Sequence, residues 1–141
     1  MNTTAYAKPV PQPTPETRPF WEGCKAHRLL LQCCDDCGHL QLYPRSLCAN
    51  CHRDHLSWKE SGGTGTVYSY SVVRRAPTKA FKADVPYVVA VIELAEGVRV
   101  MANVTGCPVE NVVIGLPVKV VFDDVTDEIS LPKFTPVGAG A

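Results

Sequence analysis

Apolar and polar residues alternate along the second half of the chain as they do in β-strands. Between residues 98 and 104, four small or branched apolar residues alternate with Arg99, Met101 and Asn103, which predicts a strand with one buried face. Alternating or continuous apolar runs predict further strands at residues 66–74, 87–94, 116–123 and 129–134. Five strands with one irregular segment, at residues 108–115, predict a small closed barrel of the OB type.

The first half of the chain consists of shorter segments. Proline stands at every second position from Pro9 to Pro15, which predicts an extended N-terminal arm that is either a disordered tail or a segment laid on a partner. Short strands are predicted at residues 29–32, 40–43 and 57–60. A Gly-rich turn follows at residues 61–65. We therefore expect an arm, a helix with a ribbon, a barrel and a frayed tail, at residues 1–16, 17–61, 62–136 and 137–141.

One helix is predicted before these strands, at about residues 18–26, with Thr17 as its N-terminal cap. Phe20, Trp21 and Cys24 fall on one side of this helix. The two aromatic rings are expected either to pack on the protein's own core or to dock against another subunit, because aromatic anchors are common at interfaces. Phe20 and Trp21 are therefore candidate partner-binding residues.

Two C-x2-C pairs lie ten residues apart in the first half of the chain. Two intervening residues let both sulfur atoms of a pair reach one metal ion, and Gly38 frees the backbone to turn beneath the second sulfur. Zinc favours four thiolates in a tetrahedron, so the pattern predicts a structural zinc ribbon. Its predicted ligands are Cys34, Cys37, Cys48 and Cys51. The neighbouring Cys33 could compete with Cys34, but only Cys34 has the two-residue spacing to Cys37.

Other interpretations of the cysteines fit the sequence less well. The run Cys48-Ala-Asn-Cys51-His52 also matches the pattern for covalent haem attachment, but that role needs an exported chain and leaves the first pair unused. A redox pair is expected at a strand-to-helix turn, which is not predicted here, and disulfides suit secreted chains. The remaining cysteines are expected to be small buried thiols: Cys24, Cys33 and Cys107. Three histidines could replace a thiolate, but four cysteines already fill the site: His39, His52 and His55.

Composition narrows the range of partners. The chain has 141 residues, enough for one domain or two small ones, and 45% of them are apolar. Fourteen basic residues balance fourteen acidic ones, which argues against a protein whose main role is to grip the nucleic-acid backbone. No apolar run reaches the length of a membrane span, and the N-terminus lacks an apolar signal core. We therefore expect a cytoplasmic protein with reduced thiols.

The order of these parts resembles a known family. The chain carries, in order, a Pro-Phe-Trp-Glu helix, Leu-x-Gln-Cys, the two cysteine pairs around Pro44-Arg45, Trp58, Ser61-Gly62, Gly65-Thr-Val67 and Ile114-Gly-Leu-Pro-Val118. Over about residues 15–134 it is similar to small acyl-CoA-associated proteins that join a rubredoxin-like zinc ribbon to an OB-fold. It departs from their pattern at Cys33, where an arginine or similar residue is more usual, and in the doubled Gly62-Gly63.

This resemblance implies an accessory role. Such proteins sit beside thiolases, aldolases and acyltransferases of the thiolase fold, and they scaffold or complete an acyl-CoA site. The resemblance also implies a structural zinc, a coenzyme A thioester shared with the partner, and a heterotetramer in which a thiolase-type dimer carries two copies of this subunit. The residues themselves also show no catalytic constellation. A zinc ion with four thiolates has no open position, and Cys107 has no evident histidine near it in sequence.

The loop between the first two barrel strands is a candidate recognition site. Arg74, Arg75, Lys79 and Lys82 bring four positive charges into nine residues, together with Phe81. Three interpretations of this loop are possible. It is a solvated segment, a contact with acidic patches on the partner, or a clamp on the nucleotide end of coenzyme A. In the last case, arginine would grip phosphate and the ring would stack on adenine.

A nucleic-acid binder is the alternative function, because OB barrels and zinc ribbons both occur in that role. It predicts a basic face with stacking aromatic rings. Tyr68 and Tyr70 are expected to share one strand face, with Arg74 at the same parity. The balanced charge and the order of the motifs count against this alternative.

Overall fold

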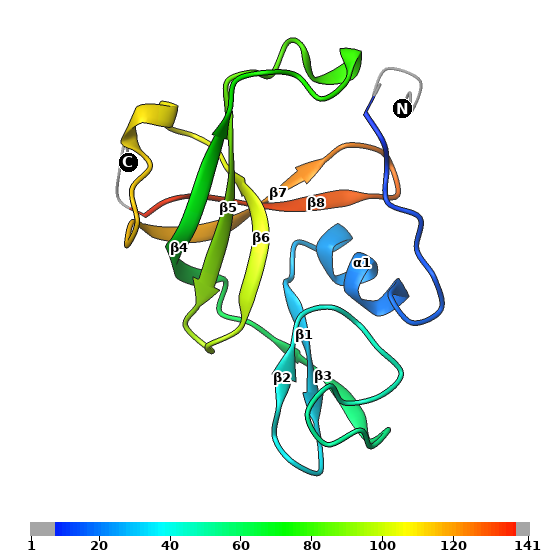
Figure 1. The fold of residues 1–141 in the computed structure, drawn as a ribbon. Coiled ribbons are helices and arrows are strands. Elements are labelled where there is room, and N and C mark those ends of the chain that lie inside the picture. The colour runs from blue at the N-terminus through cyan, green and yellow to red at the C-terminus, as the bar shows by residue number, and fades with distance from the viewer. Residues whose placement is uncertain (1–7, 138–141) are drawn as a thin grey trace.

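The computed structural model describes residues 8–137, which form one α-helix, a three-stranded sheet and a closed five-stranded barrel (Figure 1). The mostly β fold class, with a helix, a ribbon and an OB-type barrel, is therefore confirmed. No helix in this part of the chain is long and apolar enough to cross a membrane. The start of the expected arm and most of the expected tail lie outside the described residues.

The small sheet has the strand order β2-β1-β3 and is antiparallel throughout. Its strands are β1 (Leu30–Cys34), β2 (Leu40–Gln41) and β3 (Leu56–Glu60). β2 ends two residues earlier than predicted, because the chain leaves the sheet at Leu42, whose side chain packs in the core.

The barrel has the order β4-β5-β6-β8-β7 and closes between β7 and β4. Its strands are β4 (Thr64–Val73), β5 (Tyr87–Leu94), β6 (Arg99–Val104), β7 (Pro117–Asp124) and β8 (Ser130–Pro136). All neighbours are antiparallel except β6 and β8, which are parallel and pair only at Val104 and Phe134. Two short 3-10 turns lie in the connections, η2 (Lys79–Phe81) before β5 and η3 (Val109–Asn111) before β7.

A single core joins the helix, the ribbon and the barrel. Phe20, Leu31 and Leu42 come from the first half of the chain and pack in the same buried cluster as Ile92 and Phe134 of the barrel. Figure 1 shows helix α1 (Arg18–Lys25) beside the barrel, where it contacts β7 and β8. Because the ribbon completes the barrel's core, the two parts hold each other in a fixed orientation.

The start of helix α1 differs from the prediction. Thr17 makes no side-chain cap; its Oγ1 accepts a hydrogen bond from the Thr14 N–H at 2.8 Å instead. The Thr14 carbonyl oxygen accepts a hydrogen bond from the Arg18 N–H at 2.8 Å, so the preceding turn provides a partner for an N–H group at the start of the helix. The chain leaves the helix through His27, which adopts a left-handed φ of 61°.

A β-bulge in β4 places the two tyrosines of this strand on different faces. Val67 pairs with Ile92 and Ser69 with Val91, so Tyr68 is the extra residue of the bulge. Tyr70 then lies opposite Ala90, which faces the core, whereas the Tyr68 ring lies 3.8 Å from the Arg99 guanidinium. The prediction that Tyr68 and Tyr70 share one strand face is therefore wrong, because it assumed an unbroken alternation.

Gly65 allows a test of the close approach between β4 and β5. A Cβ atom at this position would overlap the carbonyl oxygen of Glu93. Gly65→Ala is therefore expected to lower the free energy of unfolding by about 1–3 kcal/mol, measured by urea denaturation. Gly62→Ala is the matched control, because its Cβ would meet only the Glu96 carboxylate, at 3.8 Å. Equal stabilities of the two variants would contradict the described packing.

Candidate metal centre and surrounding surface

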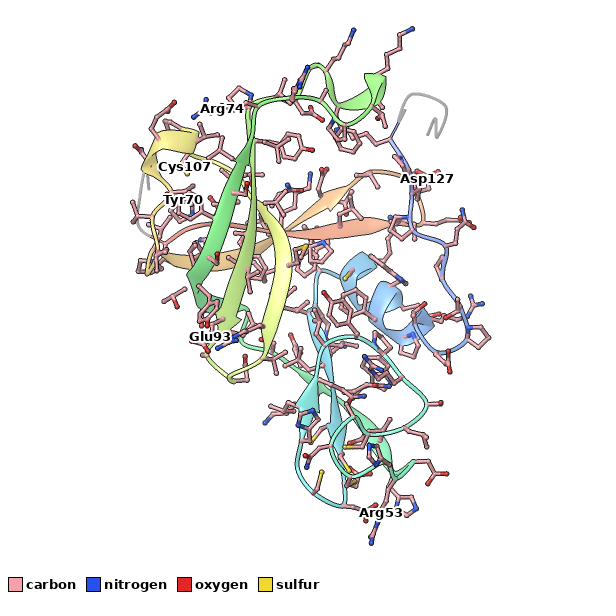
Figure 2. All side chains as sticks on the ribbon, viewed as in Figure 1. Arg53, Tyr70, Arg74, Glu93, Cys107 and Asp127 are labelled. Atoms are coloured by element: carbon pink, nitrogen blue, oxygen red, sulfur yellow. The ribbon has the colours of Figure 1, made fainter. Side chains whose placement is uncertain are left out.

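The four paired cysteines meet at the end of the ribbon. Their sulfur atoms all lie within 4.8 Å of one another. The Cys34 and Cys51 sulfurs are 3.5 Å apart, and the Cys37 and Cys48 sulfurs are 3.6 Å apart. A tetrahedral zinc ion with bonds of about 2.3 Å separates its sulfur ligands by about 3.8 Å, so the cluster has the size of a zinc site. Arg53, which follows the second pair, marks this end of the molecule in Figure 2.

Both cysteine pairs form the same backbone turn. The Gly38 N–H donates to the Cys34 carbonyl oxygen, and the His52 N–H donates to the Cys48 carbonyl oxygen, both at 2.9 Å. Gly38 and His52 have left-handed φ values of 77° and 66°. Gly38 is the residue that the sequence marked for this turn; His52 takes the equivalent position in the second pair, although a side chain makes this conformation costlier.

Nearby N–H groups favour the thiolate form of Cys37. Hydrogen bonds from the Asn50 side chain and from the His39 backbone lower the pKa of Cys37 to about 6. The Cys51 N–H also points at the Cys48 sulfur, at 3.4 Å. The shift of Cys51 is in the opposite direction: despite a hydrogen bond from the Arg53 backbone, burial and the three neighbouring sulfurs raise its pKa to about 12. Thiolates are the form that binds zinc, so the contacts at Cys37 favour metal binding there. The donor set of four sulfurs thus supports a structural zinc and leaves no open position for a substrate.

The competing residues lie outside the cluster. The Cys33 sulfur approaches the Cys34 carbonyl oxygen at 3.8 Å rather than the other sulfurs. His55 bonds through Nδ1 to the Asp36 carboxylate at 2.7 Å, and this contact raises its pKa. None of the described histidines joins the four sulfurs. All described cysteines are free thiols, so no disulfide competes for the four that meet here.

Two of the three leftover cysteines, Cys24 and Cys107, lack the properties of a nucleophile; of the three, Cys24 is buried as expected, whereas Cys33 and Cys107 are only half-buried. Burial raises the pKa of Cys24 to about 12 and also raises the pKa of the half-buried Cys107. Both therefore stay protonated at neutral pH. Cys107, labelled beside Tyr70 in Figure 2, belongs to the barrel, whereas the four histidines all belong to the first half of the chain.

A polar cluster that contains a serine, a histidine and a carboxylate has the wrong order for nucleophilic catalysis. The Asp124 carboxylate accepts hydrogen bonds from the Ser130 hydroxyl and, at 2.9 Å, from His27 Nε2. A nucleophilic serine needs the histidine beside it, but here the carboxylate lies between them. His27 also stacks on Phe122 with ring centres 5.2 Å apart. The cluster therefore ties the end of the helix to the barrel.

The cationic loop projects from the opposite end of the molecule, beyond Arg74 in Figure 2. Four of its side chains are exposed and form no ion pair with the described residues: Arg74, Arg75, Lys79 and Lys82. Phe81 is half-buried, with its ring centre 5.9 Å from that of Tyr87. The loop thus offers free positive charge, while part of its aromatic ring already packs on the barrel.

The described part of the N-terminal arm lies on the protein's own barrel, an arrangement that the sequence analysis did not consider. Lys8 pairs with Asp84 at 2.5 Å, and its ammonium group lies 5.7 Å from the centre of the Phe81 ring. Pro9 lines the same cavity as these residues. Along residues 8–16, the arm therefore acts as an intramolecular strap.

Sequence reasoning missed an apolar groove between the ribbon and the barrel. Tyr43 and Met101 are 59% and 62% exposed and line a cavity of about 370 Å³ together with Trp21 and Phe20. A signal for Met101 existed, since it is an apolar residue on the polar side of its strand. Trp21 was predicted to pack on the core or on a partner; it contacts the core and also borders this groove.

Comparisons with known proteins agree with this architecture. Residues 21–57 match the ChsH2 rubredoxin-like zinc ribbon domain, and residues 58–123 match the ChsH2 C-terminal OB-fold domain. A DUF35 domain-containing scaffold protein of Methanocaldococcus jannaschii is 38% identical over 96 residues, which cover 67% of each chain. A solved structure, the Ltp2-ChsH2(DUF35) aldolase, has a chain that superimposes with a TM-score of 0.81 at 36% identity, covering 89% of this chain and 98% of that one.

A longer relative contains the same module. A probable enoyl-CoA hydratase alpha subunit of Thermomonospora curvata is 39% identical over 118 residues, or 83% of this chain. This chain spans only 36% of that protein's length. The ribbon, the barrel and these matches together show that the chain belongs to the family of DUF35 scaffold proteins, acyl-CoA-associated accessory proteins that join a ChsH2-type zinc ribbon to an OB-fold.

Proposed function

We propose that the chain is a non-catalytic subunit that scaffolds a thiolase-type acyl-CoA enzyme and helps to complete its acyl-CoA site. The observation that carries this proposal is the similarity to the DUF35 chain of an Ltp2-ChsH2 aldolase over 98% of that chain. The name of that aldolase joins a module of this kind to a second protein, Ltp2. The relatives named as a scaffold protein and as a hydratase alpha subunit support an accessory role in the same way.

The described residues fit a subunit without chemistry of its own. The four clustered thiols are proposed to bind one structural zinc ion, through Cys34, Cys37, Cys48 and Cys51. The ribbon is too small to fold by burial alone, so the metal supplies folding free energy rather than a reactive position. Cys24 and Cys107, whose pKa values are raised, and the cluster around Asp124 do not provide an activated nucleophile.

The proposed partner is a thiolase-fold protein, and the proposed assembly is a heterotetramer in which a dimer of that enzyme carries two copies of this chain. The ligand shared with the partner is a coenzyme A thioester. We assign the exposed cations of the β4–β5 loop, led by Arg74 and Arg75, to its nucleotide end, because guanidinium groups bind phosphate with paired hydrogen bonds. The reduced thiols of such a protein suit the cytoplasm.

Assays of activity test this proposal. The purified chain is expected neither to cleave nor to form a β-ketoacyl-CoA. After mixing with the thiolase-fold protein of the same organism, the activity or the solubility of that enzyme should rise. The measurement is thioester cleavage followed spectroscopically for the chain alone, the enzyme alone and the mixture. Robust thiolysis by the chain alone would overturn the accessory role.

The nucleic-acid alternative loses its main structural support. The Arg99 guanidinium lies over the Tyr68 ring, and Tyr70 belongs to the other side of β4, so the two rings form no shared stacking platform. A salt-sensitive mobility shift with single-stranded oligonucleotides would restore this alternative.

A further inference from the structure

β6 and β8 diverge and leave a gap in the wall of the barrel. The two strands pair only at Val104 and Phe134. Two cavities of about 370 and 380 Å³ lie along the gap and share the lining residues Asn103, Leu131 and Lys133. These cavities share both strands as walls and adjoin each other along the edge of β6.

The edge of β6 that faces this gap has free hydrogen-bonding groups. The Leu94 N–H donates to the Val98 carbonyl oxygen at 2.8 Å across the β5–β6 hairpin. In an antiparallel pair these bonds recur at every second residue, so Val100 and Ala102 also bond to β5. The intervening Met101 therefore points its N–H and C=O groups away from β5, where they have no backbone partner within residues 8–137.

Apolar side chains lie beside this free edge. Met101 and Tyr43 are largely exposed there, and Trp21 borders them. Tyr43 belongs to a loop that two buried glutamines hold in place. Gln32 donates to the carbonyl oxygen of residue 45 at 3.0 Å, and Gln41 accepts from the N–H of residue 49 at 2.9 Å. A surface that is already ordered loses less conformational entropy when it binds a partner.

The charges at the rim of the gap are already neutralised. Among the charged residues that line the two cavities, Lys133 lies 2.7 Å from the Asp123 carboxylate, and Lys8 lies 2.5 Å from the Asp84 carboxylate. The rim therefore carries no excess charge that would select an anion or a cation. It is complementary to an uncharged, apolar segment of chain.

We propose that this gap receives an extended apolar segment of the enzyme subunit, which adds as a strand to the free edge of β6. The backbone of an extended peptide repeats donors and acceptors at the spacing of a strand, so it can satisfy the groups of Met101. An apolar side chain of the added strand would cover Met101 and Tyr43. The inference rests on the proposed function, since it names where the partner enzyme binds.

Hydrogen exchange at single-residue resolution tests the strand addition in the complex with the thiolase-fold subunit. The Met101 amide is expected to exchange freely in the isolated chain and at least about a hundredfold more slowly in the complex. The Val100 and Ala102 amides, bonded to β5 in both states, serve as internal controls. A complex that forms without protecting the Met101 amide would overturn this inference and leave the proposed function intact. Failure of any thiolase-fold subunit to bind would overturn both.

A pair of substitutions separates the backbone contact from the side chain. Met101→Pro removes the N–H that faces the gap and leaves every hydrogen bond to β5 in place, as proline at a free strand edge allows. Met101→Ala keeps that N–H and removes the side chain. The dissociation constant of the complex is expected to rise about tenfold more for Met101→Pro than for Met101→Ala. Circular dichroism is expected to show that both variants are folded. Equal effects of the two variants would contradict a strand addition.

Discussion

Cys48→Ser is expected to abolish zinc binding and to unfold the ribbon. Cys48 is buried, and its sulfur receives hydrogen bonds from the N–H groups of Asn50 and Cys51 at 3.3 and 3.4 Å. Structural zinc sites of this size contribute roughly 10–16 kcal/mol of apparent binding free energy, which is also folding free energy. Zinc content measured by elemental analysis should fall from one ion per chain to nearly none, and limited proteolysis should cut between residues 33 and 56.

Cys33→Ser provides the matched control. Cys33 is next to a predicted ligand, but its sulfur lies outside the cluster, so this variant should keep its zinc and its resistance to proteolysis. Full zinc retention after Cys48→Ser would contradict the assigned ligand set. Loss of zinc from Cys33→Ser would show that Cys33, and not Cys34, is the first zinc ligand.

Arg74→Ala combined with Arg75→Ala is expected to raise the Michaelis constant of the assembled enzyme for its acyl-CoA substrate by well over tenfold. Each lost hydrogen bond between charged groups costs about 1.5–3 kcal/mol, and a factor of ten corresponds to about 1.4 kcal/mol. The side chains are exposed and have no ion pair among the described residues, so their removal should not destabilise the fold.

Two controls show whether the loop contacts the nucleotide. A pantetheine thioester lacks the phosphates and adenine, so its Michaelis constant should barely change in the double variant. Arg53→Ala removes an exposed cation at the opposite end of the molecule, and it should leave both constants unchanged (Figure 2). If both substrates respond equally, or neither responds, the loop is not the nucleotide clamp.

The cluster of four cysteines could be predicted because its signal is local. Two residues between paired cysteines fix where both sulfurs point, whatever the rest of the chain does. The choice between Cys33 and Cys34 followed from the same spacing, and the structure brings Cys34 into the cluster. Strand β6 was predictable for a similar reason, since uninterrupted alternation determines which side of a strand is buried, and β5 was predicted from a nearly continuous apolar run.

The features that escaped prediction depend on contacts between distant segments. The bulge at Tyr68 shows no local sign, yet it moves Tyr70 to the other face of β4. The barrel order, and with it the gap between β6 and β8, follows from which strand ends meet, which periodicity does not report. The core shared by Phe20 and Phe134 likewise joins residues more than a hundred positions apart.

Co-expression of this chain with the thiolase-fold protein of its organism tests the central claim most directly. The purified complex would be measured by size-exclusion chromatography with light scattering, with only one of the two proteins tagged. One stable species with the mass of an enzyme dimer plus two copies of this chain is expected. Elution of the two proteins as separate species at micromolar concentration would contradict it.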